Sequence, residues 1–393
     1  MAGASDNQRR VSAHVAPATD MISALPDDVL LLVLSKLSSR EAVHTCFLAQ
    51  RWRDLWRSVP IINVSFEDFE DRPAEDDVER EAMFKKFVNR LLMLRNPVSL
   101  DEFRLVYNSS TDDDDASDDA NDWISHASEH NARYVKVVDQ CEPLELDTEV
   151  FASSYLKRLH IASANLDPDF FHDLQTGCPA LEYLFLCDCF IQDVENFINT
   201  LKVLVLSLEV VFVDHASISA PSLISLSIVG DFRGRMLPKL HDMASLETAS
   251  INLWGNILAC DADAIRHLLG SLSHVTSLEF FYEANKLTME NNFRWCPTFT
   301  NLINLTLDAW CVHAEFYGLV VFLQKSPNLK KLTLKLYQGD VVAITGELED
   351  RSFTCEQLEI VEIICSETSQ LLPRVTQFLG DSGITPDKLH LSH

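Results

Sequence analysis

The sequence has few basic residues and little glycine. Among its 393 residues, Lys and Arg number 32 against 59 Asp and Glu, which gives a formal net charge of −27. Such a surface repels nucleic acid and anionic membranes, and it favours a neutral or basic protein partner. With 11 glycines and 47% hydrophobic residues, the composition is that of a folded protein with an ample core rather than of a disordered chain.

Signals of secretion, membrane insertion and disulfide bonding are also lacking. The first 20 residues are polar, contain Arg9 and Arg10, and have no apolar core segment, so we expect a disordered leader rather than a secretory signal. The longest apolar run, near residues 201–213, contains Lys202 and Glu209 and is too short to cross a bilayer. The ten cysteines show no paired spacing, which indicates reduced thiols in the nucleus or the cytoplasm.

The sequence contains no motif of catalysis or cofactor binding. It has no glycine-rich phosphate loop, no H-E-x-x-H motif, and no serine or cysteine nucleophile motif paired with His160 or His172. Cys187-Asp188-Cys189 lacks a second pair and a nearby histidine, so we interpret it as part of a strand rather than as a metal site. We therefore expect no cofactor, no metal and no catalysis by the chain itself.

An acidic run at residues 111–120 contains six aspartates. It lacks the glycine and the terminal glutamate of an ordered calcium loop. Repulsion between the like charges favours a solvated loop, and attraction of a basic partner is the alternative.

The stretch from residue 22 to residue 60 is rich in leucine and tryptophan, and it predicts three short helices. Pro26 suits the first position of a helix, and Asp27 and Asp28 follow in the first turn, where the helix dipole favours acids. Two apolar stripes run along this helix, one more than a surface helix needs for its own core. The stripes are Val29, Leu30, Val33, Leu34 and Leu37, and then Leu31 and Leu32.

The other two helices of this stretch have clear signals of their own. Ser38 and Glu41 have the spacing of a capping box, which predicts the start of the second helix. The third helix carries Trp52, Leu55 and Trp56 on one face. So short and apolar a segment is a poor independent domain, and its composition predicts a clamp on a partner.

This stretch resembles an F-box. The LPDDVL opening, the leucine-rich first helix, the SSREAVHT segment and the RWRDLW segment match that motif at the right spacing. The resemblance implies binding to a Skp-type adaptor of a cullin–RING ubiquitin ligase. Carried over by position, the adaptor-binding residues are Leu25, Pro26, Leu30, Leu34, Val43, Cys46, Trp52 and Leu55. The alternative is a small helical cap on the following domain.

A leucine-rich pattern begins at residue 100 and continues almost to the end of the chain. Leu181-x-x-Leu184-x-Leu186-x-x-Cys189-x-Ile191 matches the core of a leucine-rich repeat, in which Cys189 holds the Asn-or-Cys position. Ten further units follow the same pattern less completely, at spacings of roughly 20 to 32 residues. Their first core positions are Leu100, Ala132, Leu156, Leu201, Leu223, Leu246, Val275, Leu302, Leu329 and Leu358.

Each of these units supplies one strand whose apolar residues cannot be buried without neighbouring units. Helical segments, such as residues 170–176, 262–269 and 316–324, lie between the strands. We therefore predict an α/β fold in which a three-helix module precedes an irregular leucine-rich-repeat solenoid, an arc with parallel strands on its concave face. An ordinary α/β sheet is the alternative.

The predicted domain division follows from these patterns. It consists of a disordered leader (1–20), an F-box (21–60), a connecting strand and helix (61–99), the solenoid (100–366) and a C-terminal cap segment (367–393). A helix is expected between residues 83 and 94, and another between residues 371 and 379.

The module and the repeats together resemble the plant F-box/leucine-rich-repeat proteins, particularly those of grasses. GCPALEYLFLCDC at 177–189 and FLQKSPNLKKLTLKL at 322–336 are similar to that family's repeat boundaries. The resemblance implies a non-catalytic substrate receptor of a Skp–cullin–F-box ubiquitin ligase, with an adaptor on the F-box and a target protein on the repeats. A repeat scaffold or sequestering protein that is not coupled to degradation is the alternative.

Strand alternation predicts which side chains line the concave face. The middle outward positions are Arg104, Lys136, His160, Phe185, Val205, Ser227, Ser250, Glu279, Thr306, Thr333 and Glu362. Only two of these are acidic, so we expect the acidic residues mainly on loops and on the convex side. Tyr183, Phe185, Val203 and Val205 form adjacent apolar positions on two consecutive strands, and we predict a target-binding patch there. Coverage of these residues by a neighbouring loop is the alternative.

Overall fold

The structure is a computed structural model. It describes residues 22, 25–70, 77–109, 115–192, 195–207, 211–212, 216–231, 237–254, 262–283, 286–288, 296–337, 343–345, 353, 356–366 and 369–392. The predicted leader, residues 1–20, lies outside the described residues.

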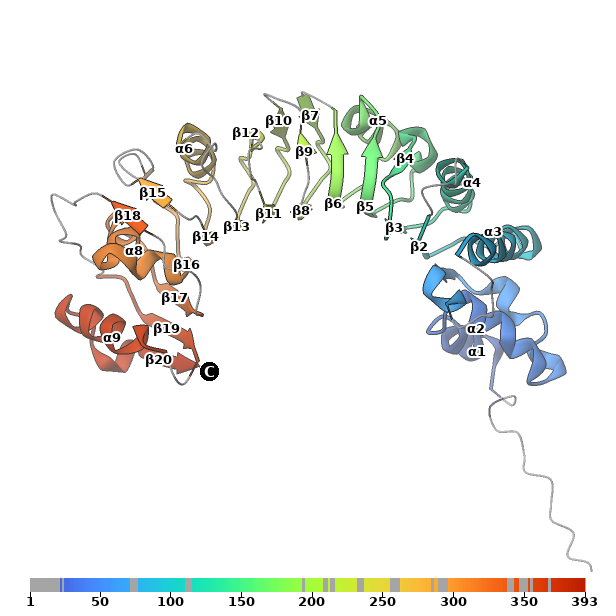
Figure 1. The fold of residues 1–393 in the computed structure, drawn as a ribbon, viewed down its shortest axis with the longest axis horizontal. Coiled ribbons are helices and arrows are strands. Elements are labelled where there is room, and N and C mark those ends of the chain that lie inside the picture. The colour runs from blue at the N-terminus through green and yellow to red at the C-terminus, as the bar shows by residue number, and fades with distance from the viewer. Residues whose placement is uncertain are drawn as a thin grey trace, which may run out of the picture.

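One sheet of parallel strands runs from end to end of the molecule, and it bends into an arch whose inner side the strands line (Figure 1). In spatial order the strands are β1 (Ile61–Ser65), β2 (Glu102–Tyr107), β3 (Tyr134–Asp139), β5 (Arg158–Leu166), β6 (Tyr183–Ile191), β8 (Val203–Ser207), β11 (Ser225–Asp231), β13 (Thr248–Trp254), β14 (Ser277–Glu283), β16 (Asn304–Asp308), β17 (Lys331–Leu336), β19 (Ile360–Cys365) and β20 (Leu389–Ser392). Spatial order therefore follows chain order, as expected when each repeat packs only on its neighbours.

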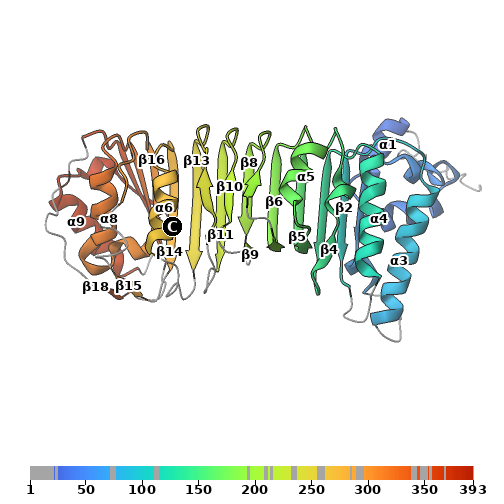
Figure 2. The ribbon, with the colours of Figure 1, turned by 90° about the horizontal axis from the view of Figure 1, so that it is seen from above.

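Helices lie on the outer side of the arch, and Figure 2 shows them running alongside the strands. They are α3 (Asp77–Leu94), α4 (Ala116–Glu129), α5 (Phe170–Gly177), α6 (Ala262–Ser271), α8 (His313–Lys325) and α9 (Leu371–Asp381). Short strands also contribute to the outer layer of the arch (Figure 1). β4 (Leu144–Leu146) and β9 (Val211–Phe212) extend the main sheet, while β7 (Glu195–Phe197), β10 (Ser217–Ser219) and β12 (Lys239–His241), and then β15 (Lys286–Thr288) and β18 (Ala343–Thr345), form two small parallel sheets.

The core lies between the strands and this outer layer. In β6, Leu184 and Leu186 are buried while Tyr183 and Phe185 are half-buried, and most of the other strands of the arch alternate in the same way. Buried residues form a continuous cluster from Leu30 in the N-terminal module to Ile384 near the C-terminus. The predicted α/β arc with parallel strands is therefore confirmed, and all eleven predicted repeat strands belong to its sheet.

The sheet extends beyond the predicted solenoid (100–366) at both ends. β1, in the predicted connecting segment, pairs with β2 as the first strand of the sheet. The predicted C-terminal cap segment ends in β20, which pairs with β19 and adds a last strand. Both strands extend the ladder because an edge strand of a parallel sheet leaves backbone N–H and C=O groups open for pairing.

The predicted solvated loop at residues 111–120 is also wrong for its described part. α4 begins at Ala116, with Asp118 and Asp119 in its first turn, where the helix dipole stabilises negative charge. Trp123 and Ile124 bury the inner face of this helix. Asp119 forms an ion pair with Lys85 of α3 at 2.8 Å. Amphipathic burial and a cationic neighbour thus outweigh the repulsion between the aspartates; residues 111–114 lie outside the described part of the chain.

Candidate protein-interaction surfaces

The N-terminal module contains two α-helices, α1 (Asp27–Leu34) and α2 (Ser39–His44), followed by three 3₁₀ turns. The predicted capping box at the start of α2 is confirmed. The Ser38 Oγ accepts a hydrogen bond from the Glu41 N–H at 3.3 Å, and the Glu41 carboxylate accepts one from the Ser38 N–H at 3.0 Å. Pro26 lies one position earlier than predicted, because its ψ of 152° is extended and α1 begins at Asp27.

The predicted third helix is instead a series of 3₁₀ turns: η1 (Thr45–Phe47), η2 (Gln50–Trp52) and η3 (Leu55–Ser58). Asp54, with φ of −116° and ψ of −3°, separates η2 from η3 and prevents one continuous helix. Both tryptophans of this segment, Trp52 and Trp56, are nevertheless buried. An ion pair between Asp27 and Arg51, at 2.6 Å, joins the beginning of α1 to η2.

Burial divides the eight predicted adaptor-binding residues into two groups. Leu30, Leu34 and Trp52 are 0%, 1% and 4% exposed, so their side chains form the core of the module and present no surface to a partner. Their assignment as contact residues is corrected to a structural role. The other five, Leu25, Pro26, Val43, Cys46 and Leu55, are exposed or half-buried.

Exposed apolar residues of the module lie beside the predicted contacts. Along α1, Val29, Leu32 and Val33 are 38%, 67% and 45% exposed, and they continue the line from Leu25 at helical spacing. We call Leu25, Val29, Leu32 and Val33 the α1 stripe. Just after α2, Phe47 and Leu48 are 86% and 70% exposed. Such a density of open apolar side chains is typical of a surface that binds a protein.

The open stripe differs in composition from both stripes expected from the sequence. Leu30 and Leu34 turn inward and Leu31 is half-buried, while Val29 and Val33, which were expected to share the stripe of Leu30, turn outward with Leu32. Sequence periodicity shows that the helix is apolar nearly all round, but the side that becomes the core depends on where η3 packs against it.

A groove of about 330 Å³ lies between the module and α3. Val43 and Trp56 line one side of it, and the α3 residues Met83, Phe87 and Leu91 line the other. Lys86 and Arg90 stand at the same groove. Val43 therefore faces a continuous apolar surface that belongs partly to the arc.

The module and the arc are joined by backbone hydrogen bonds as well as by packing. The Asn96 N–H donates to the Arg57 carbonyl at 3.0 Å, and the Asp101 N–H donates to the Pro60 carbonyl at 2.8 Å. Residues that follow α3 thus fix the end of the module next to the beginning of β2.

The row of concave side chains predicted by alternation is confirmed by the strand register. Directly paired positions run without interruption through Asn63, Arg104, Lys136, His160, Phe185, Val205, Ser227, Ser250, Glu279, Thr306, Thr333, Glu362 and His390. Because all the strands are parallel and in register, each side chain of this row lies beside the corresponding side chain of the next repeat.

The predicted target-binding residues lie together on this face. Tyr183 pairs with Val203, and Phe185 pairs with Val205, across β6 and β8. All four are half-buried, so each keeps part of its surface open. Their binding role stays a prediction.

Overlapping this patch, six side chains of β3, β5 and β6 form a second feature, whose contacts the sequence did not predict. We call it the concave block; it consists of Tyr134, Lys136, Arg158, His160, Tyr183 and Phe185. The Arg158 guanidinium lies over the rings of Tyr134 and Tyr183, at 4.7 and 5.4 Å from their centroids. His160 and Phe185 are stacked, with centroids 4.1 Å apart. The period-two alternation that identified the middle row also places Tyr134 and Arg158 on this face, two positions earlier in their strands.

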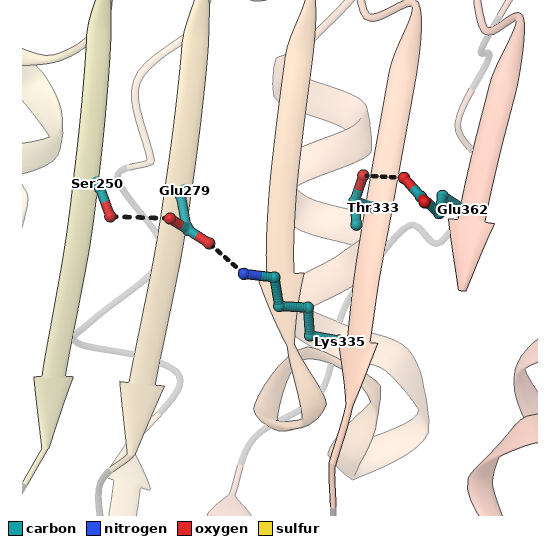
Figure 3. Close-up of polar contacts among 5 residues, drawn as sticks. All are labelled: Ser250, Glu279, Thr333, Lys335 and Glu362. Carbon is teal, nitrogen blue, oxygen red and sulfur yellow. Dashed lines mark hydrogen bonds and ion pairs between the residues drawn. The ribbon is translucent and has the colours of Figure 1, made fainter. Parts of the chain in front are cut away.

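The other end of the concave face carries ion pairs (Figure 3). Glu279 of β14 accepts a hydrogen bond from the Ser250 hydroxyl at 2.9 Å and forms an ion pair with Lys335 of β17 at 2.6 Å. Lys335 reaches past β16 to make this contact. Glu362 of β19 pairs with Lys331 at 2.8 Å and accepts a long hydrogen bond from the Thr333 hydroxyl at 3.5 Å.

The cysteines at 187 and 189 have the environment of structural thiols. Cys189 is buried, and its Sγ donates to the Cys187 carbonyl at 3.2 Å. Burial raises the pKa of both thiols to about 12, with the negative charge of Asp188 adding to the effect. Among the residues that the structure describes, no group of three or more His, Cys, Asp or Glu side chains is placed to hold a metal ion.

None of the described helices combines the length and the apolar character that crossing a bilayer requires.

Comparison with known proteins agrees with the module and the repeats. The family model for the F-box domain matches residues 22–63. F-box/FBD/LRR-repeat protein At1g78750 of Arabidopsis thaliana is 27% identical over 376 residues, covering 83% of this chain and 79% of its own. F-box/LRR-repeat protein 13 of the same plant is 26% identical over 440 residues, covering 96% of this chain and 93% of its own. With an F-box at its N-terminal end and an arc of leucine-rich parallel strands after it, the chain is similar in sequence and architecture to the F-box/LRR-repeat proteins of Arabidopsis thaliana.

Proposed function

We propose that the chain is the substrate receptor of a Skp–cullin–F-box ubiquitin ligase. In this role the F-box binds a Skp-type adaptor, and the concave face of the arc binds the target protein. The observation that carries the proposal is the α1 stripe: an F-box with open leucine and valine side chains, joined by hydrogen bonds to a sheet that offers a long binding face.

The α1 stripe supports adaptor binding on energetic grounds. Leu32 and Val33 have 67% and 45% of their surface in water, although both lie on a helix whose opposite side is buried. Covering an apolar side chain of this size stabilises a complex by about 1.5–3 kcal/mol when burial is complete. Phe47 and Leu48 add further apolar surface of the same kind.

In this proposal the chain supplies proximity rather than chemistry. A receptor holds the target so that its lysines meet an activated ubiquitin at high effective concentration, while other subunits of the ligase carry the reacting groups. No disulfide bond joins the eight described cysteines, which supports a reducing location. We propose the nucleus or the cytoplasm, and imaging of a fluorescent fusion in plant cells would test it.

The test is a pull-down of the full chain with a purified Skp-type adaptor. We expect the wild type to bind and Leu32→Asp to lose binding, because a carboxylate in the interface would be desolvated without a partner. Leu391→Asp, which puts the same charge on an exposed leucine at the far end of the arc, is the matched control and keeps binding. Failure of a folded wild type to bind the adaptor would overturn the proposal.

A reconstituted ubiquitin-transfer assay separates this function from that of a scaffold. With adaptor, cullin and RING subunits present, a receptor transfers ubiquitin to protein held on its arc. Adaptor binding without transfer to any protein captured by the arc would favour a scaffold or sequestering role.

A further inference from the structure

The concave block carries positive charge that is not neutralised by the chain itself. Lys136 and Arg158 form no ion pair with any residue in the described part of the chain. At the other end of the same face, Lys331 and Lys335 are paired with Glu362 and Glu279. The end of the concave face near β3 and β5 therefore carries net positive charge, whereas the lysines at the other end are neutralised by glutamates.

The positive charge of Lys136 and Arg158 is unusual in a chain that is strongly acidic overall. The whole chain has a net charge of −27, so its average surface attracts basic partners. In the neighbouring strand β2, Arg104 is already paired with Glu102. Lys136 and Arg158 are thus available to an acid from another molecule, on a face where strand pairing fixes their backbones.

Arg158 is held in a favourable way for such a contact. Its guanidinium lies over two tyrosine rings from the adjacent strands, so stacking restrains the plane of the group. The residue is exposed, and no side-chain hydrogen bond joins it to another described residue. A restrained guanidinium with free N–H edges matches the two oxygens of a carboxylate.

Apolar surface lies directly beside these cations. Phe185, stacked on His160, is next to Val205, and Tyr183 is next to Val203. From Arg158 on β5 to the valines on β8 there are two strand spacings, or about 10 Å. This distance corresponds to about three residues of an extended chain.

We propose that the concave block binds an acidic segment of the target protein in which an Asp or Glu lies within three residues of an aliphatic or aromatic residue. The carboxylate pairs with Arg158 and Lys136, and the apolar side chain packs on Phe185, Val203 and Val205. This proposal rests on the proposed function, in which the arc recruits a target.

The experiment selects peptides from a randomised display library on the purified full chain, without adaptor. Selected sequences are expected to combine Asp or Glu with an apolar residue at the stated spacing. Fluorescence polarisation then gives the affinity of a labelled selected peptide. Replacing its acid by the neutral amide is expected to weaken binding about tenfold or more, as for loss of a charge-assisted hydrogen bond.

Variants of the chain locate the site. Arg158→Gln and Lys136→Gln are each expected to weaken peptide binding about tenfold. Lys335→Gln removes the same charge from the other end of the concave face and is expected to leave the affinity unchanged. Selection of no sequence, selection of sequences without an acid, or an equal loss in Lys335→Gln would overturn the proposal.

Adaptor binding is measured on the same three variants. A chain that binds its adaptor but selects no acidic peptide would overturn the inference and leave the receptor function in place. A chain that selects acidic peptides through Arg158 but binds no adaptor would overturn the receptor function and leave the acidic-segment site in place.

Discussion

The Ser39 side chain accepts a hydrogen bond from the backbone N–H of Asn63 at 2.9 Å. Ser39 is the first residue of α2 in the F-box, and Asn63 is the central residue of β1, the first strand of the arc. The bond is shielded, since Ser39 is 7% exposed. It therefore couples the F-box to the sheet of the arc at a buried point, in addition to the backbone hydrogen bonds from Asn96 and Asp101.

Removal of this hydrogen bond is expected to destabilise the junction. Ser39→Ala leaves the Asn63 N–H without its acceptor, at a cost of about 1–3 kcal/mol for a buried donor. Urea denaturation of the full chain, followed by tryptophan fluorescence, measures the effect. Ser154→Ala, at an exposed turn in the arc, is the control and should leave the midpoint unchanged; equal midpoints for both variants would contradict the assigned role of Ser39.

The corrected roles of the F-box leucines lead to a second prediction. Leu30→Ala and Leu34→Ala remove fully buried side chains, so each is expected to lower the free energy of unfolding of the module by about 2–5 kcal/mol. Leu32→Ala trims an exposed side chain and should change stability by less than about 0.5 kcal/mol, while weakening adaptor binding. Thermal unfolding followed by circular dichroism checks the stabilities, and a loss of stability in Leu32→Ala as large as in Leu30→Ala would refute the division.

Two helical glycines are expected to respond to alanine in opposite ways. A Cβ on Gly318 of α8 would lie 2.3 Å from the Trp310 ring, whereas a Cβ on Gly380 of α9 would have no neighbour within 4 Å. Gly318→Ala should destabilise the arc by about 1–3 kcal/mol through overpacking. Gly380→Ala should stabilise it by about 0.4–1 kcal/mol, because alanine loses less backbone entropy.

The melting temperatures of these two variants, measured against the wild type, test both predictions. A rise for Gly380→Ala together with a fall for Gly318→Ala is the expected pattern. A rise for both would mean that Trp310 moves aside without cost, and the close approach of α8 to that ring would then have no structural role.

His160 predicts how stability depends on pH. Burial lowers the pKa of His160 to about 4, and the positive charge of Lys136 acts in the same direction. In the unfolded chain the ring has its ordinary pKa of about 6.5, so unfolding takes up a proton between pH 6.5 and 4. Stability attributable to this group is therefore full above pH 6.5 and is lost progressively as the pH falls toward 4.

Comparison of the wild type with His160→Phe isolates this contribution. The difference in melting temperature between the two proteins should stay constant from pH 8 to pH 6.5 and change in favour of the variant from pH 6.5 to 4. A difference that is independent of pH over the whole range would show that the ring titrates alike in the folded and unfolded chain.

Register was predictable from the sequence because it depends on a local rule. In a strand the side chains alternate, so Leu184 and Leu186 inside require Phe185 outside, and the same rule applied in each repeat gives the full concave row. The F-box was predictable for a similar reason, since its capping box and leucine spacing lie within a few residues of each other.

Features that depend on contacts between distant segments were not predictable in this way. Lys335 pairs with Glu279 across an intervening strand, 56 residues away in the chain, and no sequence spacing indicates that contact. The acidic residues of α4 predict a loop from the sequence alone, because the ion pair with Lys85 and the burial of Trp123 depend on the tertiary structure. Likewise, the inward side of α1 is chosen by the turns that pack on it.

The uninterrupted ladder from β1 to β20 has a mechanical consequence for the proposed receptor function. Each strand is one fixed step, so Arg158 on β5 lies three steps, or about 14 Å along the sheet, from the strand to which the F-box is tied. A target bound there would be held at a fixed distance and in a fixed orientation relative to the adaptor. Gain or loss of one repeat between the F-box and the site of Arg158 would move the target by about 5 Å. The number of repeats would therefore determine which lysines of the target come within range of ubiquitin.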